Sequence, residues 1–350
     1  MVETFFSRVE MSLFAMVAHL RFMAIFFLFP KKKKSKTRKE EPQMTTRRIF
    51  ALLLALVLAF ALCACGSNDT PASDAPSANP TADIPPVADL TGVDTSAFPG
   101  VEDGVLTVGM ECAYAPYNWT QLDDSNGAVP IVNGDGTFAN GYDVMIAQRI
   151  CDAYGWKLEV MAIGWDGLIP ALQSGQIDAV IAGQSMTEDR MAEVDMAGPY
   201  FYASIVCVAQ KGSEQSKATG ISNLSGTCTA QTGTIWYDSC LPQIPGAEIM
   251  TEAETSPAMI MAVTTGTADF ICTDMPTAMG ACATYDNLMI LDFTGSGDDF
   301  QVDEGEINIG ISVVKGNSQL KDAMDTVLGD MTVDHFNALM NYAISVQPAI

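Results

Sequence analysis

Short apolar runs alternate with amphipathic segments through the middle of the chain. The predicted elements of this first set are a strand at residues 105–110, a helix at 142–154, a strand at 157–162, a helix at 167–173 and a strand at 177–182. In the first helix Val144, Ala147 and Cys151 recur at helical spacing, and Gly155 marks its end. Strands and helices in this order predict parallel βαβ units, whose ligands bind beyond the carboxyl ends of the strands.

A second set with the same alternation follows. Its predicted elements are a strand at 226–231, a helix that starts at 234–240, a helix at 257–265, strands at 268–272 and 307–314, and an amphipathic helix at 318–328. No segment of 20 to 50 residues repeats, which argues against a solenoid. The pattern therefore predicts an α/β protein with two sets of elements.

An export pattern precedes these two sets. Residues 44–64 combine Arg47 and Arg48 with an apolar stretch that is too short for a comfortable membrane span and fits a secretory signal peptide. The end of this segment, LCAC before Gly66, resembles a bacterial lipobox, which implies cleavage before Cys65 and a diacylglycerol on its sulfur. The alternative is an uncleaved anchor helix. Both interpretations put the body outside the membrane and tether it there.

Two further segments flank this signal. Residues 1–43 contain an apolar stretch and a basic run, which fit a transmembrane helix with a cytoplasmic flank. The complete signal that begins at Met44 favours an overextended gene start instead. Residues 65–100 are rich in Ser, Pro, Ala, Asp and Thr, so we expect a flexible, disordered linker between the anchor and the body.

The charge and the cysteines of the body exclude several classes of partner. From Cys65 onward 38 Asp and Glu accompany only seven Lys and Arg, and such a body repels nucleic acid.

The seven cysteines after Cys65 cannot all pair, and no two have a C-x-x-C spacing, so buried free thiols are expected; Cys228 and Cys240 are the one pair to check. The loop at 120–140 lacks the EF-hand pattern and predicts a turn-rich hairpin. We expect neither a metal nor a cofactor.

The most specific chemical signal is an arginine in an acidic body. Only Arg149 and Arg190 occur after residue 64, and Arg190 ends the stretch AVIAGQSMTEDR directly after a predicted strand. A free amino acid needs a guanidinium with hydroxyl or amide donors for its carboxylate, and an acidic oxygen for its ammonium. Arg190 can meet the first need with Ser185 and a helix N-terminus near Thr187; the alternative is a surface ion pair with Glu193. Aromatic residues that suit the walls follow nearby strands: Tyr114, Tyr117, Trp119 and Trp165.

A run of matching stretches gives the chain a family resemblance. In order they are VGMECAYAPYNW, GYDVMIAQRI, GWDGLIPALQSGQIDAVIAGQSMTEDR, VDMAGPYFY, GTADFICTD and NSQLKDAMDTVL. Each stretch alone is weak evidence, but together, behind a lipobox, they are specific. From about Gly104 to Tyr342 the chain resembles the bacterial extracellular solute-binding proteins of family 3, the polar amino acid receptors of ABC importers.

This resemblance implies a fold and a division into lobes. The fold is α/β and two-lobed, of the type II periplasmic-binding-protein kind, with two connecting hinge strands near residues 207–211 and 307–311. Lobe 1 is expected to comprise residues 101–207 plus 311–350, and lobe 2 residues 208–310. Ligand binds between the lobes, which close over it.

The resemblance also implies which residues hold the backbone of an amino acid. Arg190, helped by Ser185 and the backbone of Gly183, takes the α-carboxylate, and Asp274 takes the α-ammonium. In the second lobe only Thr234 and backbone amides are left for the carboxylate, because the next residue is apolar where many relatives carry a hydroxyl group.

The ligand side chain has its own expected contacts. Tyr114 and Trp165 are expected to sandwich it, and Glu111 to contact its polar end. Gln184 and Trp119 are expected to add further polar contacts with it. The acid at Glu111 gives a modest preference for a basic amino acid.

The expected function is therefore binding and delivery rather than catalysis. The resemblance implies a monomeric, lipid-anchored receptor on the extracytoplasmic face of the membrane, with a free amino acid and ABC permease subunits as partners and no catalytic residues. A cyclohexadienyl (prephenate or arogenate) dehydratase-like enzyme on the same fold is an alternative, although the only histidine of the body, His335, lies in the C-terminal helix. A ligand sensor for a signalling receptor is the other alternative, because it would use the same lobe closure.

Overall fold

The computed structural model describes residues 84–348 of the chain. These residues belong to one compact unit, and none of their helices combines the length and apolarity that a membrane crossing needs. The expected signal peptide, the lipidation residue Cys65 and the segment 1–43 lie outside the described residues.

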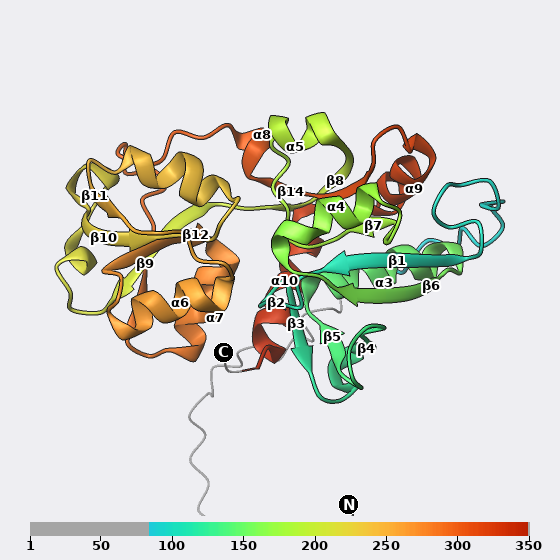
Figure 1. Ribbon diagram of the computed structural model, residues 1–350, viewed down its shortest axis with the longest axis horizontal. Coiled ribbons are helices and arrows are strands. Elements are labelled where there is room, and N and C mark those ends of the chain that lie inside the picture. Colours follow the sequence, from blue (N-terminus) through green and yellow to red (C-terminus); the bar gives the residue numbers. More distant parts are fainter. Residues whose placement is uncertain (1–83, 349–350) are drawn as a thin grey trace, which may run out of the picture. The chain divides into compact units, whose positions relative to one another are not determined.

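The first lobe is built on a five-stranded mixed sheet (Figure 1). In spatial order its strands are β6 (Lys157–Ala162), β1 (Val105–Met110), β7 (Ala179–Val180), β14 (Asn308–Val314) and β8 (Val194–Tyr202). Strands β6, β1 and β7 are parallel, whereas β14 is antiparallel to both β7 and β8. The helices that pack on this sheet are α3 (Tyr142–Tyr154), α4 (Leu168–Gln173), α9 (Ser318–Leu328) and α10 (Val333–Val346). Helices cover the parallel strands, which explains why β1 is a nearly continuous apolar run.

The second lobe repeats this arrangement with a different stretch of the chain. Its strands, in spatial order, are β11 (Gly246–Ile249), β10 (Ser225–Thr229), β12 (Phe270–Asp274), β9 (Ile205–Gln210) and β13 (Leu288–Leu291). Strands β11, β10 and β12 are parallel, and β9 is antiparallel to β12 and β13. Helices α6 (Ser256–Thr265) and α7 (Met275–Thr284) pack against β12 and β9. The two-lobed α/β fold predicted from the sequence is thus confirmed.

The chain crosses twice between the lobes (Figure 1). The first crossing follows β8 at Ala203 and Ser204, because β9 already pairs with β12 from Ile205 onward. The second crossing ends with the short helix α8 (Glu304–Ile307), after which β14 pairs with β8. The expected hinges at 207–211 and 307–311 therefore lie mostly within strands β9 and β14, and the lobe boundaries move about three residues earlier. The hydrophobic pattern cannot locate such a crossing, since it continues unbroken into the sheet.

An ordered N-terminal segment, here called the strap (residues 84–100), packs on lobe 1. The second body arginine holds it: Arg149 donates from Nη1 to the carbonyl oxygen of Pro85 at 2.9 Å and from Nη2 to that of Pro86 at 3.3 Å. The N–H of Leu90 donates to the carbonyl oxygen of Ala153 at 2.8 Å. Residues 84–100 were expected to be part of the flexible linker; instead their apolar side chains pack against the core of the lobe.

The hairpin predicted at 120–140 is confirmed as part of a small separate sheet. Its strands are β2 (Ala113–Tyr114), β3 (Asn118–Gln121), β5 (Phe138–Asn140) and β4 (Val129–Pro130). Among the described residues no group of His, Cys, Asp or Glu has the geometry of a metal site. The seven body cysteines are all free, so Cys228 and Cys240 do not form a disulfide. Where the sequence predicted a helix at 234–240, the chain forms one short π-helical turn, Trp236–Cys240.

Candidate functional site

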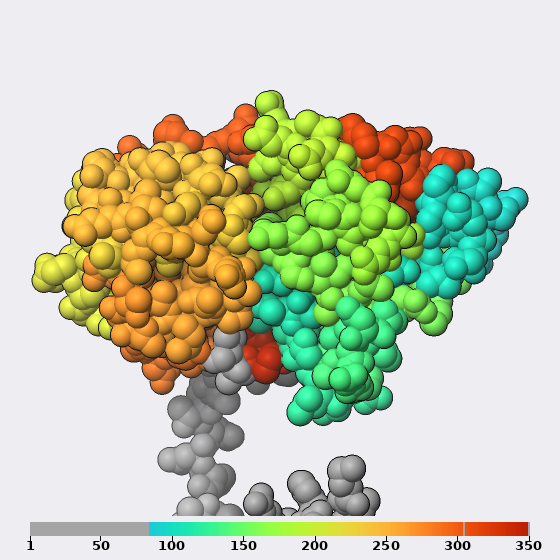
Figure 2. Space-filling model, in the orientation of Figure 1, coloured from blue at the N-terminus to red at the C-terminus, as the bar shows by residue number. Residues whose placement is uncertain are grey.

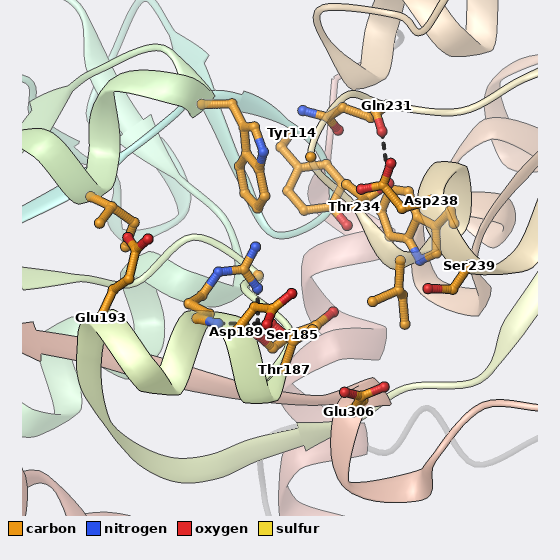
Figure 3. A pocket seen from close by; sticks show the side chains of 17 residues that line it. Tyr114, Ser185, Thr187, Asp189, Glu193, Gln231, Thr234, Asp238, Ser239 and Glu306 are labelled. Carbon is orange, nitrogen blue, oxygen red and sulfur yellow. Dashed lines mark hydrogen bonds between the residues drawn. The ribbon is translucent and has the colours of Figure 1, made fainter.

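A cavity of about 500 Å³ lies between the two lobes (Figure 3). Lobe 1 contributes Tyr114, Trp165, Ile169, Gly183, Ser185, Thr187, Asp189, Arg190 and Glu193; lobe 2 contributes Gln231, Gly233, Thr234, Ile235, Trp236, Asp238 and Ser239; the second crossing contributes Glu306. Many of these residues follow the carboxyl ends of β1, β7 and β10, where α/β sheets bind their ligands. In Figure 2 the surfaces of the two lobes touch along a seam.

Six of the nine residues expected to bind ligand line this cavity, and three do not. The six are Tyr114, Trp165, Gly183, Ser185, Arg190 and Thr234. The other three, Glu111, Gln184 and Asp274, are buried around the cavity and hydrogen bonded to other parts of the protein.

Arg190 is the only basic residue among the described residues that line the cavity. It lies in the short helix α5 (Glu188–Glu193), whose N-cap Thr187 accepts a hydrogen bond from the Arg190 N–H at 3.2 Å. Its guanidinium donates from Nη1 to the carbonyl oxygen of Ser185, and its Cζ lies 5.7 Å from the centre of the Trp165 ring. None of the ion pairs between described residues includes Arg190, so the alternative of a surface ion pair with Glu193 is not formed, although the charge of Glu193 raises the Arg190 pKa against the effect of burial. Burial lowers the pKa of this guanidinium to about 10, because the charged form loses hydration.

Ser185 presents its backbone between two hydrogen bonds to β14. Met186 N donates to Asn308 O at 2.8 Å, and Gly310 N donates to Gln184 O at 3.0 Å. Neither bond uses the N–H of Ser185, which remains available beside Arg190. The N–H of Gly183, in contrast, donates to the Tyr200 hydroxyl at 3.0 Å. It is therefore not free to donate to a ligand carboxylate, as was expected of the Gly183 backbone.

Gly183 itself is required by its surroundings. Its φ is +65°, and an added Cβ would lie 2.7 Å from Cε1 of Tyr114 and 3.3 Å from two atoms of the Tyr117 ring. Only glycine combines this left-handed conformation with such a close approach of an aromatic ring. The rings of Tyr114 and Tyr117 are stacked, with centroids 4.8 Å apart.

Asp274 is a structural link between the lobes in this conformation. It caps helix α7, where its Oδ1 accepts the N–H of Thr277 at 2.8 Å. Its Oδ2 accepts the hydroxyl of Tyr114, in the other lobe, at 2.6 Å. Only 1% of Asp274 is exposed, and burial raises the pKa of its carboxyl group above the ordinary value. Tyr114 therefore lies between the cavity and the carboxylate that was expected to receive an ammonium group.

Glu111 makes the second hydrogen bond between the lobes. Its Oε2 accepts the side-chain N–H of Gln231 at 3.2 Å, whereas its Oε1 is buried without a partner among the described residues. Burial raises the pKa of Glu111 to about 7, since the carboxylate loses hydration; the hydrogen bond from Gln231 opposes this shift.

The prediction that Gln184 makes a polar contact with the ligand side chain is wrong, because the Gln184 side chain points into the protein interior. Its Oε1 accepts the hydroxyl of the buried Ser312 on β14 at 2.8 Å. Trp119, named with it, is 3% exposed and absent from this cavity, as is Tyr117. The aromatic walls come instead from Tyr114 and Trp165, and from Trp236 in lobe 2, which the sequence reasoning missed.

The missed wall residues of lobe 2 share one position in the fold. They follow strand β10, as Gly183 to Arg190 follow β7 in lobe 1. The family resemblance implied only Thr234 and backbone amides from this loop, as donors for the carboxylate. The equivalence of the two strand ends was the available signal, and it would have pointed to Trp236, Asp238 and Ser239.

The comparisons with known proteins agree with this arrangement. Residues 106–342 match the family model described as bacterial extracellular solute-binding proteins, family 3. The chain is 24% identical to the L-cystine-binding protein TcyJ of Escherichia coli (strain K12) over 234 residues, which cover 67% of this chain and 79% of that protein. It is 30% identical to the ABC transporter glutamine-binding protein GlnH of Bacillus subtilis (strain 168) over 199 residues, or 55% of this chain and 68% of that one.

A solved structure shows the same fold. It is an amino acid ABC transporter substrate-binding protein from Streptococcus pneumoniae bound to L-arginine, with a TM-score of 0.60 and 24% identity. The match covers 70% of this chain and 95% of that chain. A family model that spans most of the body, together with the two-lobed fold and the cavity between its lobes, identifies the chain as a member of the bacterial extracellular solute-binding proteins, family 3.

Proposed function

We propose that the protein binds a free L-amino acid, preferentially a cationic one, in the cavity between its lobes and delivers it to an ABC importer. The observation that carries the proposal is Arg190, a desolvated guanidinium on the cavity wall with no ion pair among the described residues. A cation in this situation favours an anionic partner, because the partner restores the interactions lost with water.

The α-carboxylate is assigned to Arg190 and to its immediate neighbours. One guanidinium nitrogen already donates to the Ser185 carbonyl, which fixes the plane of the group. The remaining guanidinium N–H groups, the Ser185 amide and the Ser185 hydroxyl are the donors for the carboxylate oxygens. From lobe 2, the Thr234 hydroxyl already donates its proton to Gln231 O at 2.7 Å, so it does not donate to the carboxylate as the resemblance implied; it can accept a hydrogen bond from the ligand's ammonium group.

The preference for a cationic ligand rests on the acids of the same cavity. Asp189 and Glu193 line it from lobe 1, Asp238 from lobe 2, and Glu306 from the second crossing. Arg190 is the single opposing charge, so the field within the cavity favours a ligand with more positive than negative groups. The indole rings of Trp165 and Trp236 provide faces on which an alkyl chain or a cation can stack.

Asp274 does not contact the cavity here, so the α-ammonium is assigned first to the carboxylates that line it. A direct contact with Asp274 would require the Tyr114 hydroxyl to leave its 2.6 Å hydrogen bond. The Tyr114–Asp274 and Gln231–Glu111 bonds join the lobes directly. We expect both to contribute to lobe closure.

Delivery at the membrane follows from the family and from the N-terminal sequence. Family relatives include proteins named as parts of amino acid ABC transporters. Lipidation of Cys65 would hold the protein, as a monomer, at the extracytoplasmic face of the membrane, next to permease subunits. The dehydratase alternative has no histidine in the cavity to serve as general acid: His335 lies at the start of α10, where its Nδ1 accepts the Thr332 N–H at 3.1 Å, outside the cavity.

A thermal-shift screen tests the proposal. Bound ligand raises the melting temperature by mass action, so the purified protein is mixed in turn with the twenty amino acids and L-cystine. The decisive pair is L-arginine and L-citrulline, which have nearly the same shape but differ by one positive charge. We expect a clearly larger shift with L-arginine. If no amino acid shifts the transition, the binding function is wrong; if citrulline equals arginine, the cationic preference is wrong.

A further inference from the structure

A fully buried carboxylate lies beneath the cavity loops of lobe 1. Asp143 is in the first turn of α3, is 0% exposed and does not line the cavity. Its side-chain neighbours by hydrogen bond are Tyr200 and Asn118, and neither is a cation. Burying an unpaired carboxylate is costly, and burial raises the pKa of Asp143 to about 7, although Tyr200, Asn118 and the Gly183 N–H oppose this rise. A carboxylate kept at such a cost requires a structural reason.

One oxygen of Asp143 is connected to the loop after β7. The N–H of Gly183 donates to the Tyr200 hydroxyl at 3.0 Å, and that hydroxyl donates to Oδ1 of Asp143 at 2.7 Å. The direction of this chain is fixed, because a backbone N–H can only donate. When Asp143 is ionised, the hydroxyl proton must then point to the carboxylate, which makes Asp143 the terminal acceptor.

The other oxygen is connected in the same way to the loop after β1. The N–H of Cys112 donates to Oδ1 of Asn118 at 2.7 Å, and Nδ2 of Asn118 donates to Oδ2 of Asp143 at 2.7 Å. Both chains begin at residues with left-handed backbones, since φ is +65° at Gly183 and +54° at Cys112. For a residue with a Cβ, such as Cys112, this conformation persists only where the surroundings hold it.

The two loops carry cavity residues immediately beyond these points. Gly183 precedes Ser185 and Arg190, and Cys112 precedes Tyr114. We propose that Asp143 is a positioning residue that sets both ligand-contacting loops of lobe 1, acting through Tyr200 on the Gly183 loop and through Asn118 on the Cys112 loop. This inference rests on the proposed ligand site. It assigns Asp143 no contact with the ligand.

The first test measures the loops without any ligand. In ¹⁵N–¹H NMR spectra of the intact body, Tyr200→Phe is expected to shift the Gly183 amide and speed its hydrogen exchange, and to leave the Cys112 amide unchanged. Asn118→Ala is expected to do the reverse, and Asp143→Ala to perturb both amides. Tyr154→Phe is the matched control: it removes a hydroxyl that donates to Ala323 O at 3.1 Å and belongs to neither hydrogen-bond chain.

The second test measures L-arginine binding by calorimetry. Tyr200→Phe is expected to raise Kd at least tenfold, and Tyr154→Phe less than twofold. Adding Tyr200→Phe to Asp143→Ala is expected to change Kd less than twofold further, because both act through one chain. A folded Tyr200→Phe protein with an unchanged Gly183 amide, or with the Kd of Tyr154→Phe, would overturn the inference. If the unaltered protein binds no amino acid, the proposed function fails, and the amide pattern alone decides this inference.

Discussion

Replacing Arg190 by alanine is the sharpest test of the ligand site. The change removes the one cation that the described part of the chain places on the cavity wall, and it leaves Ser185 and the helix α5 cap Thr187 in place. It also removes a cation that the folded protein holds at a cost, since burial lowers the pKa of the Arg190 guanidinium well below its ordinary value, to about 10. A shift of that size corresponds to about 3 kcal/mol of lost hydration. An anionic ligand compensates for this loss, so the energy appears as binding affinity.

The expected effects on affinity and on stability therefore have opposite signs. Loss of one partner of a desolvated charge pair costs about 2 to 5 kcal/mol of binding energy. The Kd for L-arginine should rise about 30-fold to 5,000-fold. The ligand-free variant should be at least as stable as the unaltered protein, because it no longer buries an unpaired charge.

Isothermal titration calorimetry and thermal melts of the same samples measure both effects. Arg149→Ala is the matched control, since it removes the other body arginine, which holds the strap outside the cavity. That control should lower the melting temperature and leave Kd within about twofold. Unaltered affinity in Arg190→Ala, or equal losses of affinity in the two variants, would refute the assignment of the carboxylate site.

Three further changes probe the surroundings of the site. Gly183→Ala should weaken L-arginine binding at least tenfold, because its Cβ would meet Tyr114 at 2.7 Å; Gly175→Ala, with a similar φ of +73° but open space, should leave Kd unchanged in the same titration. Tyr114→Phe should favour opening of the lobes in small-angle scattering or single-molecule measurements, because it removes the hydroxyl that donates to Asp274. Unchanged opening would contradict a role of this hydrogen bond in lobe closure. Glu111→Gln should remove a pH dependence of stability. Because the pKa of Glu111 is about 7 in the folded protein against an ordinary 4.5, protonated Glu111 contributes its full stabilisation below pH 4.5, and this contribution is lost as the pH rises to 7. Denaturant melts measure the free energy of unfolding of the variant minus that of the unaltered protein, and this difference should be larger at pH 8 than at pH 4.5 by up to about 3 kcal/mol. A difference that does not depend on pH would count against a buried, protonated Glu111.

Local sequence patterns were sufficient for most of the fold. The strands at 105–110 and 157–162 and the helices at 142–154 and 318–328 have the predicted bounds, because their periodicity is strong and glycines or turns delimit them. The short strand β7, only Ala179–Val180, was predicted as six residues, since the apolar pattern runs past the last ladder hydrogen bond.

For the candidate site, too, part of the arrangement could be predicted from the sequence and part could not. The sequence alone determined that Arg190, Ser185 and Gly183 follow a strand at the ligand-binding edge of a parallel sheet, because that placement depends on local order and on a general rule of topology. The tertiary structure decided which polar groups face the cavity. Gln184 bonds to Ser312 across 128 positions, and Asp274 to Tyr114 across 160, so no local pattern could show that these side chains were already satisfied. Such long-range hydrogen bonds depend on the packing of distant segments, and only the folded chain brings those segments together.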